Sequence, residues 1–209
     1  MTERDQLAIG RILKVNHAGE YGAIRIYRAQ LWVARYRFPD MVPFLEVTLG
    51  HEIEHCALFS NAMPKRGAKP CRVLAFWGNG GLVLGLLTAL AGRQGIWICT
   101  EAVEATVHRH LNDQLFFLQS RDAELHSLIA GIQLEELHHL HYAAERITSR
   151  SLRARLLRGA ISMATEAVIW LSTWGDSTRM AKDLAAAREQ QTAQTTMGGR
   201  CCVAESFES

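Results

Sequence analysis

The chain has 209 residues, 48% of them hydrophobic, and a formal net charge of +2. This length can bury one sizeable core, and nothing in the composition indicates two independent domains. A nearly balanced charge gives no reason to expect a nucleic-acid partner. The four prolines stand where helices are expected to begin or end, and alternating β-branched runs are few, so we expect an all-α fold.

The cysteines and the first residues indicate the cellular compartment. The five cysteines form no CxxC motif and no even framework, which predicts free thiols in a reducing compartment. Residues 1–5 have neither an apolar signal core nor the character of a transit peptide. We therefore expect the protein to be made and kept inside the cell.

The first helix is predicted from about residue 5 to residue 36. Glu20 continues its apolar stripe, which consists of Ile9, Leu13, Ile24, Tyr27 and Leu31. Gly19 and Gly22 bracket this inward-facing glutamate, and each costs a helix about 1 kcal/mol relative to alanine. Such a cost predicts the close approach of another helix or of a metal ion.

The second helix is predicted from near Pro43 to near Asn61, before a basic and exposed loop at 63–70. Glu52 and His55 are three residues apart, so they lie on one helix face and can reach the same metal ion. They continue an apolar stripe, whereas Glu54 faces elsewhere.

The segment 73–92 is the most hydrophobic part of the chain and is apolar all round. Its 20 residues approach the length that spans a bilayer, so insertion has to be considered. Its five glycines weaken such a helix. A helix lying in the membrane interface beside the basic loop fits better than either a span or a plain core helix.

A break at Arg93–Gly95 is expected to precede the fourth helix, which runs to about Gln119 and carries an inward-facing Glu104. Glu101 lies three residues earlier and could compete with it as a ligand. His110 is a further candidate, either as a partner of a ligand or near a substrate.

The fifth helix is predicted from Asp122, a plausible N-cap, to Thr148. Glu136 and His139 continue its apolar stripe and repeat the Glu-x-x-His spacing. The overlapping pair Glu135 and His138 is rotated away from that stripe. A sixth helix begins near residue 151, and its tryptophans at 170 and 174 are expected in the core or an interface.

The candidate ligands form an internal repeat. Glu20 precedes Glu52 by 32 residues, Glu104 precedes Glu136 by 32, and each residue of the second half follows its counterpart by 84. Ferritin-like di-metal bundles use this pattern of one glutamate from each of two helices and Glu-x-x-His from the other two. The sequence predicts a ferritin-like four-helix bundle with two additional helices, one strongly apolar and membrane-interfacial. The predicted ligands are Glu20, Glu52, His55, Glu104, Glu136 and His139.

Burial decides whether these residues bind metal. A single Glu-x-x-His on a helix is usually a solvated pair. Four carboxylates converging in one core would repel one another and would each cost several kcal/mol of desolvation. Two divalent cations would compensate them, and a donor set rich in carboxylates suits iron or manganese better than zinc or copper.

The stretches 11–23 and 99–104, together with the two Glu-x-x-His pairs, resemble the demethoxyubiquinone hydroxylase family over residues 10 to about 180. The resemblance implies a ferritin-like monooxygenase with two iron ions per chain, bound by the six residues above. It implies hydroxylation of the ring of 2-polyprenyl-3-methyl-6-methoxy-1,4-benzoquinol with O2, at the cytoplasmic or matrix side of an inner membrane. It also implies a lipid-binding accessory protein as a partner.

The chain departs from the family pattern at two places and has an additional tail. The family often has His-Tyr where this chain has His110-Leu111, and an acidic residue where it has Leu140. No role of that tyrosine or carboxylate can be carried over. We expect a hydroxylase domain at 1–184 and a disordered polar tail at 185–209.

Other functions use the same residues. A ferroxidase or iron-storage protein would share the ligands but would expose no apolar helix, and a di-iron hydroxylase of another substrate also fits. A membrane-attached lipid carrier is the non-enzymatic alternative. An exposed apolar helix has to be covered by lipid, by a second copy of the chain or by another protein.

Overall fold

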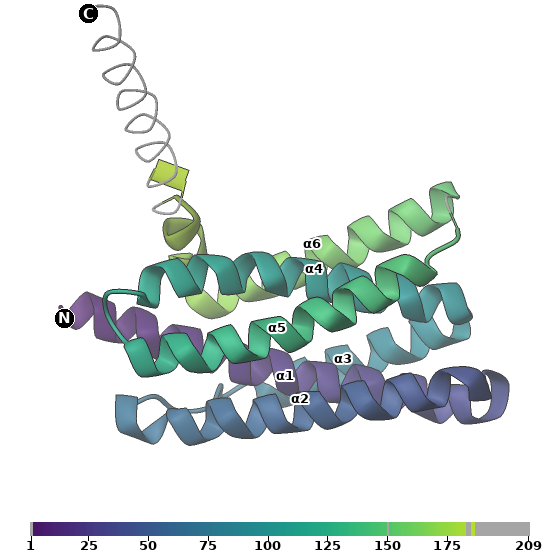
Figure 1. Cartoon of the computed structure of the whole chain (residues 1–209), viewed down its shortest axis with the longest axis horizontal. Helices are drawn as coiled ribbons and strands as arrows, with labels where there is room; N and C mark the ends of the chain where they lie inside the picture. The colour runs from purple at the N-terminus through teal and green to yellow at the C-terminus, as the bar shows by residue number, and fades with distance from the viewer. Residues whose placement is uncertain (1, 150, 183–184, 187–209) are drawn as a thin grey trace, which may run out of the picture.

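The computed structural model describes residues 2–149, 151–182 and 185–186. These residues form the six α-helices given below, further helical residues at 176–182 and 185–186, and two short 3₁₀ turns, and they contain no strand, which confirms the all-α prediction. Figure 1 shows the helices running roughly along one long axis. The helices are α1 (Glu3–Arg37), α2 (Val42–Ala62), α3 (Leu74–Leu90), α4 (Arg93–Leu118), α5 (Ala123–Arg146) and α6 (Leu152–Thr173). The tail predicted from residue 185 lies outside the described residues, apart from 185–186.

Side-chain caps define where three of the helices begin. Thr2 and Asp5 form a capping box at the start of α1. Asp122, the expected N-cap, accepts a hydrogen bond from the backbone N–H of Leu125 at 3.0 Å. The predicted break at Arg93–Gly95 is wrong, because α4 already begins at Arg93. The chain turns one residue earlier, at Gly92, which adopts a left-handed φ of 93°.

Helices α1, α2, α4 and α5 form the four-helix bundle, and α3 and α6 each pack against both α1 and α4. One apolar cluster fills one end of the bundle, and a second cluster from the same four helices fills the other. The first includes Ile12, Leu13, Phe59, Leu118 and Leu125. The second includes Tyr27, Leu31, Leu45, Ile96 and Trp97. The candidate ligands occupy the turns of each helix between these two clusters.

The glycines of α3 allow it to lie very close to α1. A Cβ added at Gly81 would overlap the carbonyl oxygen of Gly22, and one added at Gly85 would overlap that of Ile26. The expectation of close helix approach at Gly22 is therefore confirmed. The same expectation is wrong at Gly19, where nothing lies within 4 Å of an added Cβ.

The opposite face of α3 is apolar and exposed. Val83 is 54% exposed and Leu87 is 62% exposed. None of the helices in the described ranges combines the length and the apolarity needed to cross a bilayer.

Helix α6 packs through Ile161 and Ile169, which are buried. The expectation that the two tryptophans of this helix lie in the core is wrong, because Trp170 is 52% exposed and Trp174 is 80% exposed. Trp174 lies one residue beyond the end of α6 and adopts a left-handed φ of 53°, so the helical spacing of four residues does not extend to it. The other predicted location of these tryptophans, an interface with a partner, stays a prediction.

Candidate metal centre

All six predicted ligands point into the middle of the bundle. The exposed fraction is between 1% and 3% for five of them and is 8% for Glu20. Each belongs to an apolar stripe that packs above and below it, so the helical period directs the polar side chain inward with its neighbours. The register predicted from the stripes is therefore confirmed for all four helices.

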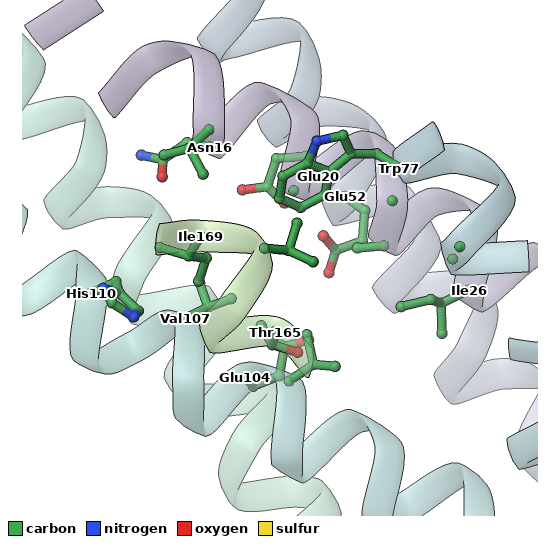
Figure 2. Close-up of a pocket in the computed structure, with 18 of the residues that line it drawn as sticks. Asn16, Glu20, Ile26, Glu52, Trp77, Glu104, Val107, His110, Thr165 and Ile169 are labelled. Carbon is green, nitrogen blue, oxygen red and sulfur yellow. The ribbon is translucent and has the colours of Figure 1, made fainter. Parts of the chain in front are cut away.

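The six side chains form two overlapping groups. The first contains Glu20, Glu52, His55 and Glu136, and the second contains Glu52, Glu104, Glu136 and His139. Within each group, one candidate ligand atom from each residue lies within 4.8 Å of those of the others. Glu52 and Glu136 belong to both groups, so these two carboxylates could contribute to either of two neighbouring ion sites. Figure 2 shows Glu20, Glu52 and Glu104 around one common space.

Both histidines direct the same ring nitrogen toward the core. His55 Nδ1 lies 3.0 Å from Glu136 Oε1, and His139 Nδ1 lies 3.3 Å from Glu136 Oε2. Their Nε2 atoms point away from the four buried carboxylates of the cluster, toward Glu135 for His55 and toward His51 for His139. A metal ion among the glutamates would therefore be bound through Nδ1.

The charges of these groups are strongly perturbed. Burial raises the pKa of Glu20 to about 7, with the charge of Glu136 contributing, and raises the pKa values of Glu52 and Glu104 well above the ordinary range. Burial also opposes the ionisation of Glu136, but hydrogen bonds with His139 and His55 outweigh it and lower the pKa of that carboxyl. Without a cation, most of the acids retain protons.

The donor set fits a pair of divalent ions. Glu52 Oε1 is buried and has no hydrogen-bond partner, which is costly unless a cation binds there. Four carboxylates and two imidazoles are hard and borderline donors of the kind that iron and manganese prefer.

Three of the competing residues lie elsewhere. Glu101 pairs with Arg158 on α6 at 2.6 Å, and Glu54 and His138 are exposed. Glu135 is half-exposed and does not enter the carboxylate cluster. The 84-residue offset therefore selected the residues that converge.

A tyrosine in contact with the centre was missed. The Tyr27 hydroxyl donates to Glu104 Oε1 at 2.8 Å, and burial together with the charge of Glu104 raises the pKa of Tyr27 well above its usual value. In the sequence, Tyr27 belongs to an apolar stripe, and the stripe does not indicate what the hydroxyl binds. A buried phenol needs a hydrogen-bond partner, and that requirement was the signal available.

An apolar cavity leads to the cluster. It has a volume of about 340 Å³, and side chains from α1, α3, α4 and α6 line it. Its inner wall includes four of the six predicted ligands, and its outer wall includes Phe76 and Trp77 of α3 and Val168 and Ile169 of α6. No sequence pattern had indicated this cavity, because its walls combine residues of α1, α3, α4 and α6 with Glu52 of α2 and Glu136 of α5.

Polar groups occur at a few points of the cavity wall. His110 lines it and contacts Glu166 Oε2 through Nε2 at 2.7 Å, so this candidate lies near the cavity and not among the ligands. Asn16 and Gln114 exchange two amide hydrogen bonds, at 2.8 and 3.1 Å. These groups could orient a ligand that has polar substituents on an apolar body.

The metal-free protein is expected to lose stability as the pH rises from 5 to 9. Folding raises the pKa of Glu20 from 4.5 to about 7. For His55, burial favours the neutral ring, but Glu136 and Glu20 outweigh burial and raise its pKa from 6.5 to about 9. Both groups bind their proton more tightly in the folded chain. Their stabilising contribution is therefore complete below the unfolded values and is lost as the pH passes the folded values.

Thermal unfolding of chelator-treated protein tests this expectation. The Tm should fall by about 5 °C or more between these two pH values, and saturation with ferrous ion should abolish the fall because metal replaces the protons. A Tm of the metal-free protein that stays constant or rises over this range would contradict the assigned shifts.

Comparison with known proteins gives a consistent result. Residues 7–172 match the family described as "Ubiquinone biosynthesis protein COQ7". A 3-demethoxyubiquinol 3-hydroxylase of Rhodospirillum rubrum is 34% identical, with 78% of this chain and 77% of the relative covered. A mitochondrial NADPH-dependent 3-demethoxyubiquinone 3-hydroxylase of Rattus norvegicus is 33% identical, with 77% and 76% covered. A mitochondrial 5-demethoxyubiquinone hydroxylase of Saccharomyces cerevisiae is 31% identical, with 78% and 76% covered. With its buried glutamate and histidine cluster and these similarities, the chain belongs to the COQ7 family of ubiquinone biosynthesis proteins.

Proposed function

We propose that this chain hydroxylates demethoxyubiquinol in ubiquinone biosynthesis, and that it does so as an O2-dependent monooxygenase with two iron ions. The substrate is 2-polyprenyl-3-methyl-6-methoxy-1,4-benzoquinol. The observation that carries the proposal is the apolar cavity that ends at four of the six buried candidate ligands. The relatives are named for this hydroxylation.

The two overlapping groups of side chains would hold the two irons. Glu20 and His55 would bind one ion, Glu104 and His139 would bind the other, and Glu52 and Glu136 would bridge them. When bound, such a pair would supply the reductive activation of dioxygen: with two electrons from an external reductant and two protons, one oxygen atom is delivered to the ring and the other leaves as water.

The protein itself would bind and orient the quinol and exclude water. The cavity walls are mostly apolar, which suits a substituted ring and the first part of a prenyl chain. The polar groups on its wall, among them Asn16, His110 and Gln114, are available to the ring oxygens. A cavity of about 340 Å³ holds a ring but not a long tail, so the rest of the tail would leave between α3 and α6.

The tail would leave toward a membrane. The outward faces of α3 and α6 both carry large exposed apolar residues, including Leu87, Leu90, Trp170 and Trp174. Contact of this surface with the inner face of a bilayer would let the quinol enter the cavity without crossing water. We infer peripheral attachment to the inner membrane, on its cytoplasmic or matrix side. A second copy of the chain or a lipid-binding accessory protein could bind the exposed apolar faces of α3 and α6 instead.

Charged substitutions on α3 test the membrane contact. The double variant Val83→Glu/Leu87→Glu should bind cardiolipin-containing vesicles at least about tenfold more weakly, because each apolar side chain contributes roughly 1.5 kcal/mol or more when buried. Hydroxylation of a short-chain quinol in detergent should persist, since neither residue lines the cavity. Val47→Glu, at an exposed position on α2, is the matched control. Equal vesicle binding by both variants would place the membrane contact elsewhere.

Quinone profiling tests the activity itself. A strain that lacks the corresponding hydroxylase should accumulate the demethoxy intermediate, and expression of this chain should restore ubiquinone. The variant Glu136→Ala should not restore it. Accumulation that persists with the wild-type chain, although the chain is expressed and contains iron, would exclude this substrate and favour the ferroxidase or another di-iron hydroxylase.

A further inference from the structure

The outer nitrogens of the two candidate ligand histidines have different partners. His55 Nε2 lies 3.1 Å from Glu135 Oε2, whereas His139 Nε2 lies 2.9 Å from His51 Nδ1. The side chains of His55 and His139 are 2% exposed, and those of His51 and Glu135 are 36% and 50% exposed. The side chains of His51 and Glu135 therefore separate the two buried histidines from solvent on the side of α2 and α5.

Binding of a metal through Nδ1 determines the direction of these contacts. A neutral imidazole that binds metal through Nδ1 has its proton on Nε2, which then donates a hydrogen bond. His55 would donate to a carboxylate oxygen. His139 would donate to Nδ1 of His51, which must accept and therefore keeps its own proton on Nε2. The ring of His51 lies nearly parallel to that of His139, at 17°, with the centroids 5.2 Å apart.

We propose that Glu135 and His51 are positioning residues for His55 and His139, and that their difference makes the two ion sites unequal. This inference rests on the proposed di-metal centre. Both sites share Glu52 and Glu136, and each adds one glutamate and one histidine. With equal sets of ligands, a difference between the sites has to come from the groups behind them.

The residues that contact the ligands from outside the cluster all favour tighter metal binding at the site of Glu20 and His55. A carboxylate acceptor makes an imidazole a stronger donor to metal than a neutral imidazole acceptor does. His55, backed by Glu135, therefore binds its ion more tightly. On the other side, Tyr27 donates to Glu104 Oε1 and withdraws electron density from that ligand. The site of Glu104 and His139 is thus the weaker one for two independent reasons.

Anaerobic titration with Co²⁺, followed by its visible absorption, tests the proposal. The wild type should bind two ions with different affinities and distinguishable spectra, because the partners of the two ligand histidines differ. His51→Ala should weaken the site of lower affinity by about 10–100-fold and leave the other unchanged. Glu135→Ala should weaken the tighter site by a similar factor. His51→Gln keeps an acceptor oxygen and should restore most of the affinity that His51→Ala loses.

Two further measurements separate positioning from simple packing. Both His51→Ala and His51→Gln lose the ring contact with His139, so the Tm of the metal-free protein should fall in both variants. A higher Co²⁺ affinity of His51→Gln than of His51→Ala would therefore report the hydrogen-bond acceptor and not packing. Glu54→Ala, an exposed change on the same helix as His51, should leave both the affinity and the spectrum unchanged.

The outcomes against the proposal are distinct from failure of the proposed function. Wild-type Co²⁺ affinity in both His51→Ala and Glu135→Ala would overturn the positioning roles while leaving the di-metal centre intact. Equal weakening of both sites by either change would overturn the assignment of one partner to each site. Uptake of less than one Co²⁺ by the wild type would remove the di-metal centre and this inference together.

Discussion

Replacement of Glu136 by alanine is expected to abolish quinol hydroxylation and to lower the iron content from two ions per chain to less than one. Among the described residues that form the two ligand groups, only Glu136 and Glu52 belong to both, and Glu136 also contacts both histidines. Activity should fall below about 1% of the wild-type value, which exceeds the roughly 10–100-fold loss typical of an outer partner. Iron analysis after anaerobic reconstitution and product formation under single turnover measure the two effects.

Neighbouring substitutions give graded controls for this experiment. Glu20→Ala and Glu104→Ala should each lose activity and retain about one ion, since each removes a ligand from one group only. Glu54→Ala should be mild, and Glu101→Ala should lose its contact with Arg158 but keep both ions. A loss from Glu54→Ala equal to that from Glu136→Ala would show that the assignment of the inward face of α2 is wrong.

The variant Gly81→Ala is expected to lower the free energy of unfolding by about 2–3 kcal/mol. Its methyl group would overlap the carbonyl oxygen of Gly22, which is backbone and can yield only if α3 moves away from α1. In a chain of this size, the Tm should fall by roughly 2–4 °C per kcal/mol. Gly85→Ala should behave in the same way against Ile26.

Gly80→Ala provides the matched control. Gly80 lies one residue away on the same helix, and nothing is within 4 Å of an added Cβ. This change should leave the Tm unchanged or raise it, by up to about 1 kcal/mol of helix propensity. If both alanine variants had the same Tm, close contact between α1 and α3 would not contribute to stability.

The fold and the convergence of the six candidate ligands were predictable from the sequence because both depend on the helical period. Glu20, Glu52, Glu104 and Glu136 each continue an apolar stripe, and their equal spacing within the two halves distinguished them from Glu101 and Glu54. A stripe does not show which helix lies opposite it. The glycines of α3 were therefore counted as a weakness of that helix, whereas Gly78, Gly81 and Gly85 are buried where it meets its neighbours.

The contacts around the ligands could not be predicted for the same reason. Tyr27 meets Glu104 across 77 residues, and His51 meets His139 across 88. Contacts of this kind depend on how two packed helices are rotated and shifted relative to each other. The spacing of residues along one helix does not predict that rotation or shift. For Trp170 and Trp174 only the prediction of a core position is wrong, because an apolar residue on a helix can face a neighbouring element or solvent, and the sequence pattern does not distinguish the two.

The arrangement of helices gives the centre two approaches of opposite character. Helices α3 and α6 cover the seam between α1 and α4, while the seam between α2 and α5 carries neither of them. A chain resting on a bilayer through α3 and α6 would turn the α2–α5 seam toward the aqueous phase. A water-soluble reductant could then deliver electrons, and protons could follow, while the lipid substrate still fills the opposite entrance.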